Sequence, residues 1–253
     1  MKKDVVAILL GRKGSKGLPG KNTSIILGRP ISHYSLMAAE HSKFVSTTFL
    51  STDDEEIIRA SSRFKVELIE RPKSLCTDEA LFEDALLHAY KEILERRKGT
   101  RPEFVVVLMC NVITITSELI DLGINALIEN PDADSAVTVS RLNMYSPLRA
   151  RKLNEKGFLQ PFVPFETFGD PDKLSCDRDS QGDVFFADMS HSVCRAVSLD
   201  NMVDGLLPQR WMGQNIIPVL NSFGCDIDEE WQVGASLSWL KGQGFSTTKT
   251  PYD

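Results

Sequence analysis

The chain of 253 residues carries a net charge of −6, with 42% hydrophobic and 25% charged residues. This composition is ordinary for a globular protein, and the length allows one large α/β domain with a sizeable core. An acidic chain is poorly suited to bind nucleic acid, so we expect no such partner. No apolar run approaches the roughly 18 residues of a membrane-spanning helix, so we expect no membrane partner.

The five cysteines are scattered along the chain and form no C-x-x-C pair. This pattern favours a reduced, cytoplasmic protein over a disulfide framework or a zinc site. The start Met1-Lys2-Lys3-Asp4 is followed by only about six apolar residues, which is unlike a signal peptide. We therefore expect the protein to work in the cytoplasm.

The apolar run Val5–Leu10 predicts a buried parallel strand. It leads into the loop GRKGSKGLPGKN, residues 11–22, which combines glycines with the cations Arg12, Lys13, Lys16 and Lys21. Glycine lets backbone N–H groups approach an anion closely, and the cations add charge. The loop predicts a polyphosphate site, with a solvated basic turn as the alternative. Neither the P-loop pattern nor G-x-G-x-x-G occurs here, which argues against an ordinary ATPase loop or NAD site.

Predicted helices and strands alternate after this loop. The expected elements are a helix over 31–44, a strand over 46–51, a helix from about 52 to 63, a strand over 66–69, a helix over 79–97, a strand over 103–109, a helix over 117–130 and a strand over 135–140. Such alternation is typical of an α/β fold with a mostly parallel sheet flanked by helices.

From 141 to about 214, prolines and polar turns interrupt the alternation. We interpret this region as an inserted arm of short strands and loops within a single domain that spans 1–253. A last strand is predicted over 216–220 and a last helix over 229–241.

Asp226 and Asp228 stand between this last strand and helix. Alternate residues of an extended chain point the same way, so these carboxylates can lie ~6.5–7 Å apart on one face. Two carboxylates beside a phosphate site suit Mg²⁺, or Mn²⁺ in its place. The alternative is that Asp226, Asp228 and Glu229 only cap and polarise the last helix.

The loop from Arg12 to Asn22 resembles the signature of the acylneuraminate cytidylyltransferases, the CMP-sialic acid synthetases and their relatives. The pattern of that family is approximately A-R-x-G-S-K-G-x-x-x-K-N, and only its alanine differs, since Gly11 stands there. The resemblance implies a Rossmann-like fold of the nucleotide-diphospho-sugar transferase type, in which this loop wraps the triphosphate of CTP. It assigns catalytic roles to Arg12, Lys16 and Lys21. It assigns nucleotide binding to Gly11, Arg12, Gly14, Ser15, Lys16, Lys21, Asn22 and Arg71.

Arg71 belongs to the segment ERPKSLCTD, residues 70–78, which resembles the family's E-R-P-x-x-L-x-x-D. The resemblance implies that this segment closes over the nucleotide. The alternative for Arg71 is a surface ion pair with Glu70 or Glu67. We expect Asp78 to cap the helix that follows. The family also carries a D-I-D motif like Asp226-Ile227-Asp228.

The acceptor site is where the sequence departs from the family. The family's L-Q-P-T-S-P segment uses its glutamine to hold the acceptor sugar, whereas Cys110 takes the glutamine's place here and Asn111 the proline's. Gln181 lies in a loose echo of another family segment, R-Q-D-x-P. We assign Cys110, Asn111 and Gln181 to the acceptor site. Cysteine forms weaker hydrogen bonds than glutamine, so we expect an acceptor other than N-acetylneuraminic acid.

The resemblance implies a homodimeric enzyme that joins the CMP of CTP to a sialic acid-like sugar acid and releases pyrophosphate. Its expected partners are therefore CTP and a small acidic acceptor. Two other interpretations stay open. One is a cytidylyltransferase for another acid, such as a phosphonate or a Kdo-like sugar acid, and the other is a relative that binds CTP without turnover.

Overall fold

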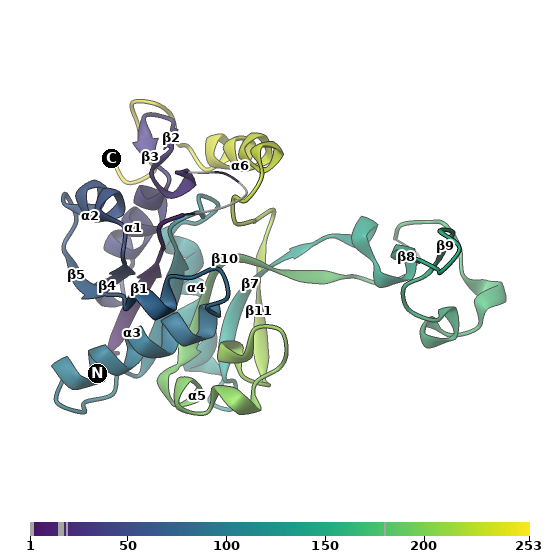
Figure 1. The fold of residues 1–253 in the computed structure, drawn as a ribbon, viewed down its shortest axis with the longest axis horizontal. Helices are drawn as coiled ribbons and strands as arrows, with labels where there is room; N and C mark the ends of the chain where they lie inside the picture. The colour runs from purple at the N-terminus through teal and green to yellow at the C-terminus, as the bar shows by residue number, and fades with distance from the viewer. Residues whose placement is uncertain (1–2, 15–17, 19, 180) are drawn as a thin grey trace.

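The computed structural model describes residues 3–14, 18, 20–179 and 181–253. Its centre is a seven-stranded sheet in the order β11-β7-β10-β6-β1-β4-β5 (Figure 1). The strands run parallel except for β10, which is antiparallel to both of its neighbours. They are β1 (Val5–Leu10), β4 (Val45–Thr52), β5 (Val66–Glu70), β6 (Phe104–Met109), β7 (Ser135–Arg141), β10 (Phe185–Arg195) and β11 (Ile216–Asn221). The predicted mostly parallel sheet is confirmed.

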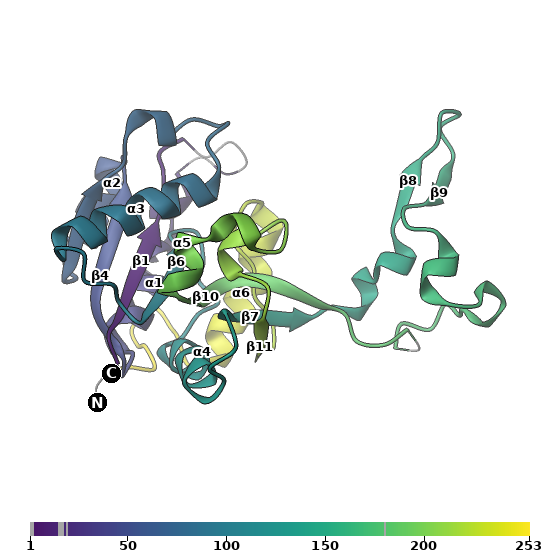
Figure 2. The ribbon, with the colours of Figure 1, turned by 90° about the horizontal axis from the view of Figure 1, so that it is seen from below.

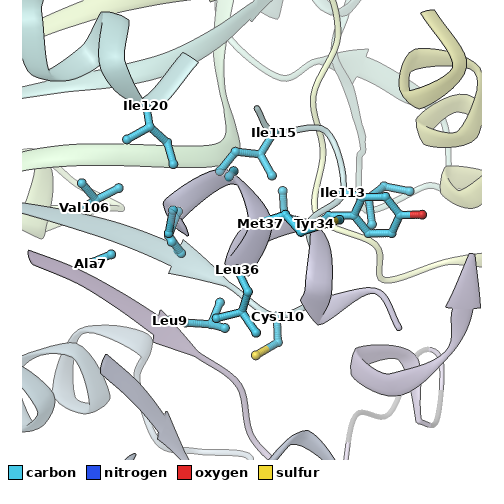
Figure 3. Close-up of a cluster of buried hydrophobic side chains, with 14 of the residues drawn as sticks. Ala7, Leu9, Tyr34, Leu36, Met37, Val106, Cys110, Ile113, Ile115 and Ile120 are labelled. Carbon is cyan, nitrogen blue, oxygen red and sulfur yellow. The ribbon is translucent and has the colours of Figure 1, made fainter. Parts of the chain in front are cut away.

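Helices cover both faces of this sheet and bury its two sets of alternating side chains. One layer is formed by α1 (Ser32–His41), α2 (Glu55–Ser61), α4 (Ser117–Glu129) and α6 (Glu230–Gly242), and the other by α3 (Phe82–Arg96) and α5 (Ala196–Asp200). Ala7 and Leu9 of β1 pack with the first layer, and Figure 3 shows Leu9 beside Leu36 of α1. A small hairpin, β2 (Ile25–Ile26) and β3 (Arg29–Pro30), precedes α1.

A long arm, residues 142–184, projects from the ends of β7 and β10 (Figures 1 and 2). It carries the two short paired strands β8 (Arg151–Leu153) and β9 (Leu159–Pro161). The predicted insertion runs to about 214, and this boundary is wrong. The arm ends at 184 because Phe185–Arg195 form β10 inside the central sheet, and α5 follows on the body.

Among the described residues, no helix is both long enough and apolar enough to cross a membrane.

Candidate active site

A cavity of about 460 Å³ opens where β1 and β6 end side by side. Ligands of open α/β sheets bind outside the carboxyl ends of the strands, so this is the expected place for a site. Its lining is drawn from several separate segments: Leu10, Gly11, Arg12, Lys21, Asn22, Arg71, Leu75, Ala80, Leu81, Phe82, Ala85, Met109, Asn111 and Asp228.

Most of the predicted site residues that the structure describes meet in this cavity. They are Gly11, Arg12, Lys21, Asn22, Arg71, Asn111 and Asp228. Gly14 is described but is not among the lining residues. Ser15 and Lys16, also predicted from the loop, lie outside the described residues.

The two ends of the glycine-rich loop are held by hydrogen bonds to the rest of the chain. At its start, Gly11 N donates to Ser51 O at the end of β4 at 3.2 Å. At its end, the buried Asn22 side chain donates to Arg12 O at 3.3 Å. Gly20 adopts a left-handed conformation with φ of 70°, which turns the chain into the short 3₁₀ helix Lys21–Thr23. The described ends of the loop therefore meet, and Lys21 lines the cavity.

Arg71 follows β5 and lines the cavity with 6% of its surface exposed. Its guanidinium donates to Ser51 O at 2.8 Å and to Ser51 Oγ at 3.3 Å. Burial lowers the pKa of Arg71, although a guanidinium stays charged at neutral pH. The alternative of a surface ion pair with Glu70 or Glu67 is wrong, because the side chain is turned inward to the cavity wall.

Arg12 is held by the segment that follows Arg71. It donates to Asp78 Oδ1 at 2.9 Å and to Cys76 O at 3.4 Å. Asp78 was expected to cap the next helix, but α3 begins only at Phe82, after the extended residue Leu81. That expectation is wrong, and Asp78 instead orients a cation beside the cavity.

Lys21 and Asp228 form an ion pair across the cavity, although they are 207 residues apart in the sequence. The Lys21 side chain is only 11% exposed, whereas Asp228 is more open to solvent. Asn111 Nδ2 also approaches Asp228 Oδ1 at 3.5 Å. A predicted phosphate-binding cation and a predicted metal-binding carboxylate therefore neutralise each other in this structure.

Asp226 lies behind Asp228 and is not among the lining residues. Burial raises its pKa first, and the charge of Asp228 raises it further, so the two carboxylates lie near enough to interact. The helix-cap alternative, which named Asp226, Asp228 and Glu229, is confirmed for Glu229 and not for the two aspartates. Glu229 is the N-cap residue of α6, and Gln232 Oε1 accepts from the backbone N of Asp228 and Glu229 at 2.7 and 2.6 Å.

The donor set of the site fits a metal ion that binds together with a phosphate ligand. In the part of the chain that the structure describes, no group of three or more His, Cys, Asp or Glu side chains could hold a metal. Asp226 and Asp228 offer only carboxylate oxygens, and Asp228 lines the open cavity. Mg²⁺ typically takes one or two protein carboxylates and completes its octahedron with water and phosphate oxygens. These residues therefore fit Mg²⁺ or Mn²⁺.

Cys110 does not line the cavity, and its assignment to the acceptor site is wrong. Its side chain is 1% exposed and lies in the core cluster near Leu9 and Leu36 (Figure 3). Burial raises the pKa of its thiol to about 12. A Cβ added at Gly11 would lie 2.5 Å from Cys110 Sγ. The thiol therefore occupies the space that a side chain at position 11 would need.

Asn111, the next residue, does face the cavity. Its amide offers the same donors and acceptor as a glutamine amide. The cavity therefore keeps an amide group, and the argument from Cys110 against N-acetylneuraminic acid loses its basis.

Gln181 lies in the arm and lines a second cavity of about 410 Å³, together with Arg149 and Arg151. Its side chain donates to Ser175 O at 2.9 Å. It takes no part in the first cavity of its own chain.

The apolar wall of the first cavity was missed from sequence. Leu75, Leu81, Phe82 and Met109 form this wall. Phe82 is fixed by the ring of Trp211, whose centroid lies 4.9 Å away. Phe82 and Ala85 are three residues apart on α3, but such spacing also fits an ordinary core helix, so the sequence gives no specific signal.

The whole fold is similar to solved nucleotidyltransferase structures. The structure of CMP:2-keto-3-deoxy-manno-octonic acid synthetase complexed with CTP matches with a TM-score of 0.66 and 15% identity, over 96% of this chain and 100% of that chain. That of 4-diphosphocytidyl-2C-methyl-D-erythritol synthase matches with a TM-score of 0.65 and 12% identity, over 95% and 100% of the two chains. At such identities the likeness defines a fold of the nucleotidyltransferase class.

The profile of the cytidylyltransferase family matches residues 6–152, more than half of the chain. The chain therefore belongs to the cytidylyltransferase family. It is 30% identical over 89 residues to N-acylneuraminate cytidylyltransferase of Escherichia coli O18:K1:H7, which is 35% of this chain and 21% of the relative. It is 37% identical over 76 residues to pseudaminic acid cytidylyltransferase of Campylobacter jejuni serotype O:2, which is 30% and 33%.

A third relative is 3-deoxy-manno-octulosonate cytidylyltransferase of Bdellovibrio bacteriovorus, 25% identical over 132 residues, which is 52% of this chain and 49% of the relative. The matched stretches thus span less than half the length of each of these three relatives.

Proposed function

We propose that the chain transfers CMP from CTP to a sialic acid-like sugar acid and releases pyrophosphate. The observation that carries the proposal is the convergence of Arg12, Lys21, Arg71 and Asp228 on one cavity at the carboxyl ends of β1 and β6. Cations for a polyphosphate and a carboxylate for its metal are what a nucleotidyl transfer requires. The names of the N-acylneuraminate and pseudaminic acid relatives support a nonulosonic acid as the acceptor.

In the proposed reaction, a hydroxyl oxygen of the acceptor attacks the α-phosphorus of CTP. The new O–P bond forms as the bond from the α-phosphorus to the bridging oxygen breaks. Pyrophosphate leaves, and the hydroxyl proton passes to solvent. Arg12 and Lys21 neutralise the charge that develops on the pyrophosphate, together with Lys16 as the sequence predicts. Gly11 and Asn22 shape the loop, and Arg71 closes the wall against which the nucleotide lies.

Asp226 and Asp228 are the proposed ligands of Mg²⁺ or Mn²⁺. When bound, the metal ion polarises the α-phosphate and makes the acceptor hydroxyl a better nucleophile. Without substrate, Lys21 and Asp228 neutralise each other's charge. With a metal–CTP complex bound, Lys21 would pair with a phosphate and Asp228 with the metal ion, so neither charge would lack a partner.

We assign the acceptor to the part of the cavity beside Asn111 and the apolar wall. The proposal also includes a homodimer formed through the arm, whose tip exposes Leu153, Phe158, Leu159 and Phe162 to solvent. Apolar side chains grouped in this way favour a protein partner. In such a dimer Gln181 would serve the partner's acceptor site. All five cysteines are unpaired, which supports a reduced compartment such as the cytoplasm.

A Kdo-like acid is the second candidate acceptor. The match to the Bdellovibrio 3-deoxy-manno-octulosonate enzyme covers 52% of this chain, more than the matches to the two nonulosonic acid enzymes. Both acceptors are carboxylated sugars, so the nucleotide site is the same in the two proposals.

Thermal unfolding with different nucleotides tests the nucleotide part of the proposal. A ligand at 100 times its dissociation constant stabilises the folded state by about 2.7 kcal/mol. We expect CTP with Mg²⁺ to raise the melting temperature clearly, and ATP or GTP to raise it little. Chelation of the metal should reduce the effect of CTP. Equal protection by ATP contradicts the cytidine assignment.

A further inference from the structure

A buried carboxylate lies behind the candidate site and has no role in the function proposed above. Asp188 is 4% exposed and sits near the start of β10, where the chain returns from the arm. The pairing of β10 with β7 is interrupted between Ala187 and Ser192, and Met189 takes a φ of 61° there. This bulge turns Asp188 into the protein. A buried carboxylate is costly unless it is hydrogen-bonded, so its contacts require an explanation.

Two uncharged donors hold the Asp188 carboxylate in place. Ser140 Oγ, from the neighbouring strand β7, donates to Oδ2 at 2.9 Å. The backbone N of Ser190 donates to Oδ1 at 3.0 Å. Each carboxylate oxygen therefore has one partner, and the side chain is fixed between the two strands.

The other side of Asp188 packs against Gly224, two residues before Asp226. A Cβ built on Gly224 would lie 2.4 Å from Asp188 Cγ and 2.4 Å from Ser190 Oγ. Distances this short do not occur in real structures, so glycine is required here for space. The metal-ligand segment, residues 224–228, therefore packs directly against Asp188 and Ser190 at Gly224.

The same contacts continue along the metal-ligand segment. Ser190 Oγ lies 3.1 Å from Thr114 Oγ1, and Thr114 Oγ1 accepts from Cys225 N at 3.2 Å. Two residues on, Ile227 N donates to Asn111 O at 2.9 Å, beside the cavity. These contacts thus link Asp188 and Ser190 to Gly224 and Cys225, directly before Asp226, and a separate hydrogen bond anchors Ile227 between the two proposed metal ligands.

We infer that Asp188 is a positioning residue that, with Gly224, sets where Asp226 and Asp228 present their carboxylates. It contacts neither the cavity nor a reacting atom, and it acts through the backbone of the metal-ligand segment. The meaning of this role for metal binding rests on the proposed function. The positioning itself does not, since it concerns only the order of residues 224–228.

The test compares three variants with a matched control. Asp188→Ala removes both acceptor oxygens, Asp188→Asn keeps the shape and one acceptor oxygen, and Gly224→Ala adds a single methyl group at the contact. The control is Gly234→Ala on α6, where an added Cβ meets nothing within 4 Å. Two readouts are measured on the full chain: hydrogen exchange of residues 222–229, and Mn²⁺ binding in the presence of CTP, followed by electron paramagnetic resonance.

We expect faster exchange over 222–229 in Asp188→Ala and Gly224→Ala, with β1 still protected. Their Mn²⁺ affinity should fall by ~10-fold or more, the usual effect of removing a residue that orients metal ligands. Asp188→Asn should stay within about threefold of the parent chain, because it keeps the shape and a hydrogen-bonding group at each position. Gly234→Ala should match the parent in both readouts.

Unchanged exchange and unchanged Mn²⁺ affinity in both Asp188→Ala and Gly224→Ala would overturn the inference. An Asp188→Asn variant that binds Mn²⁺ as weakly as Asp188→Ala would also overturn it, because the carboxylate charge would then act on the metal itself. If Asp188→Ala does not fold, Gly224→Ala and the milder Ser140→Ala, which removes one donor, decide the question. Absence of Mn²⁺ binding in the parent chain counts against the proposed function instead, and the exchange result still decides the role of Asp188.

Discussion

At the scale of single residues, Lys21 and Asp228 neutralise each other's charge within the site. Each is the other's counterion, and both face the cavity. An ion pair that is open to solvent on the Asp228 side contributes at most about 1 kcal/mol to folding, so its loss should cost little stability. Substitutions at either position therefore report on ligand binding and turnover.

Asp228→Asn separates the two charges. The variant keeps the side-chain shape but frees Lys21 from its counterion. With the metal chelated, we expect it to bind CTP at least as tightly as the parent chain, measured by calorimetry. With Mg²⁺ present, its turnover should drop and recover partly at high Mg²⁺ or Mn²⁺. Normal turnover at low Mg²⁺ would mean that the carboxylate does not hold the metal.

Lys21→Ala removes the cation itself. We expect turnover to fall by ~100-fold or more, in line with the loss of a preorganised electrostatic contact in a transition state. The melting temperature without ligand should stay close to that of the parent chain. Near-normal steady-state turnover in this folded variant would exclude the loop as the phosphate site.

The Gly11–Cys110 contact is also a feature of individual residues. Gly11→Ala places a Cβ 2.5 Å from Cys110 Sγ, and we expect it to destabilise the protein by about 1–3 kcal/mol. Cys110→Ala removes the Sγ contact but leaves Cys110 Cβ at 2.9 Å and Ile57 Cδ1 at 3.0 Å, so the double variant should recover part of the loss. A double-mutant cycle in urea unfolding measures this coupling. Additive effects would show that the two side-chain positions do not share the same space.

The error at Cys110 has a simple physical cause. The strand β6 ends at Met109, and in the turn that follows, Cys110 is buried in the core, whereas Met109 and Asn111 on either side of it line the cavity. Matching a motif position by position shows which residue replaces which, but not where its side chain points. The role of the glycine-rich loop was easier to predict, because glycines and cations at fixed spacing favour the binding of a phosphate group.

At the scale of elements, strands made of one apolar run were predictable and β10 was not. β1 and β6 are continuous apolar runs and were found within a residue or two. β10 buries Asp188, Ser190, His191 and Ser192, so it carries little of the apolar signal of a central strand. Its place between β6 and β7 comes from tertiary pairing with partners 44 to 91 residues away, from Phe185↔Arg141 to Arg195↔Phe104.

His191 gives β10 a pH-dependent stability. Burial lowers its pKa to about 3, against a usual value of 6.5. The unfolded chain therefore takes up a proton first as pH falls from about 6.5 towards 3, and the folded state loses stability over that range, by at most about 1.4 kcal/mol per pH unit. Above pH 7 this group has no effect.

Urea unfolding at pH 7.5 and pH 5 measures the contribution of His191 to the unfolding free energy. His191→Leu cannot take up a proton, so its unfolding free energy should fall less between the two pH values than that of the parent chain. Equal losses in both proteins would mean that His191 is protonated as easily in the folded state as in the unfolded state.

At the scale of the whole molecule, the arm is an insertion whose two ends join the body at neighbouring positions of β7 and β10. Arg141 and Phe185 are paired across β7 and β10 where the arm leaves the sheet, so a two-residue Asn-Gly turn can replace residues 142–184. The sequence indicated where the arm begins, because the helix–strand alternation stops there. It could not indicate how far the arm projects, which depends on how β10 pairs.

Deleting the arm in this way should leave a folded body. We expect the deletion variant to keep the protection by CTP and Mg²⁺, since the cavity lies on the body. Light scattering should find a monomer, against a dimer for the full chain. A deletion variant that stays dimeric, or a full chain that is monomeric at micromolar concentration, contradicts the role of the arm in assembly.

Pyrophosphate release from CTP, measured with Mg²⁺ across a panel of nonulosonic acids, Kdo and simple phosphonates, tests the central claim most directly. We predict release with at least one sugar acid, in equal amount with a CMP-sugar product. ATP or GTP should give little, and no release should occur without an acceptor. A chain that binds CTP but releases pyrophosphate with none of the sugar acids, or one that uses ATP equally well, would contradict the account.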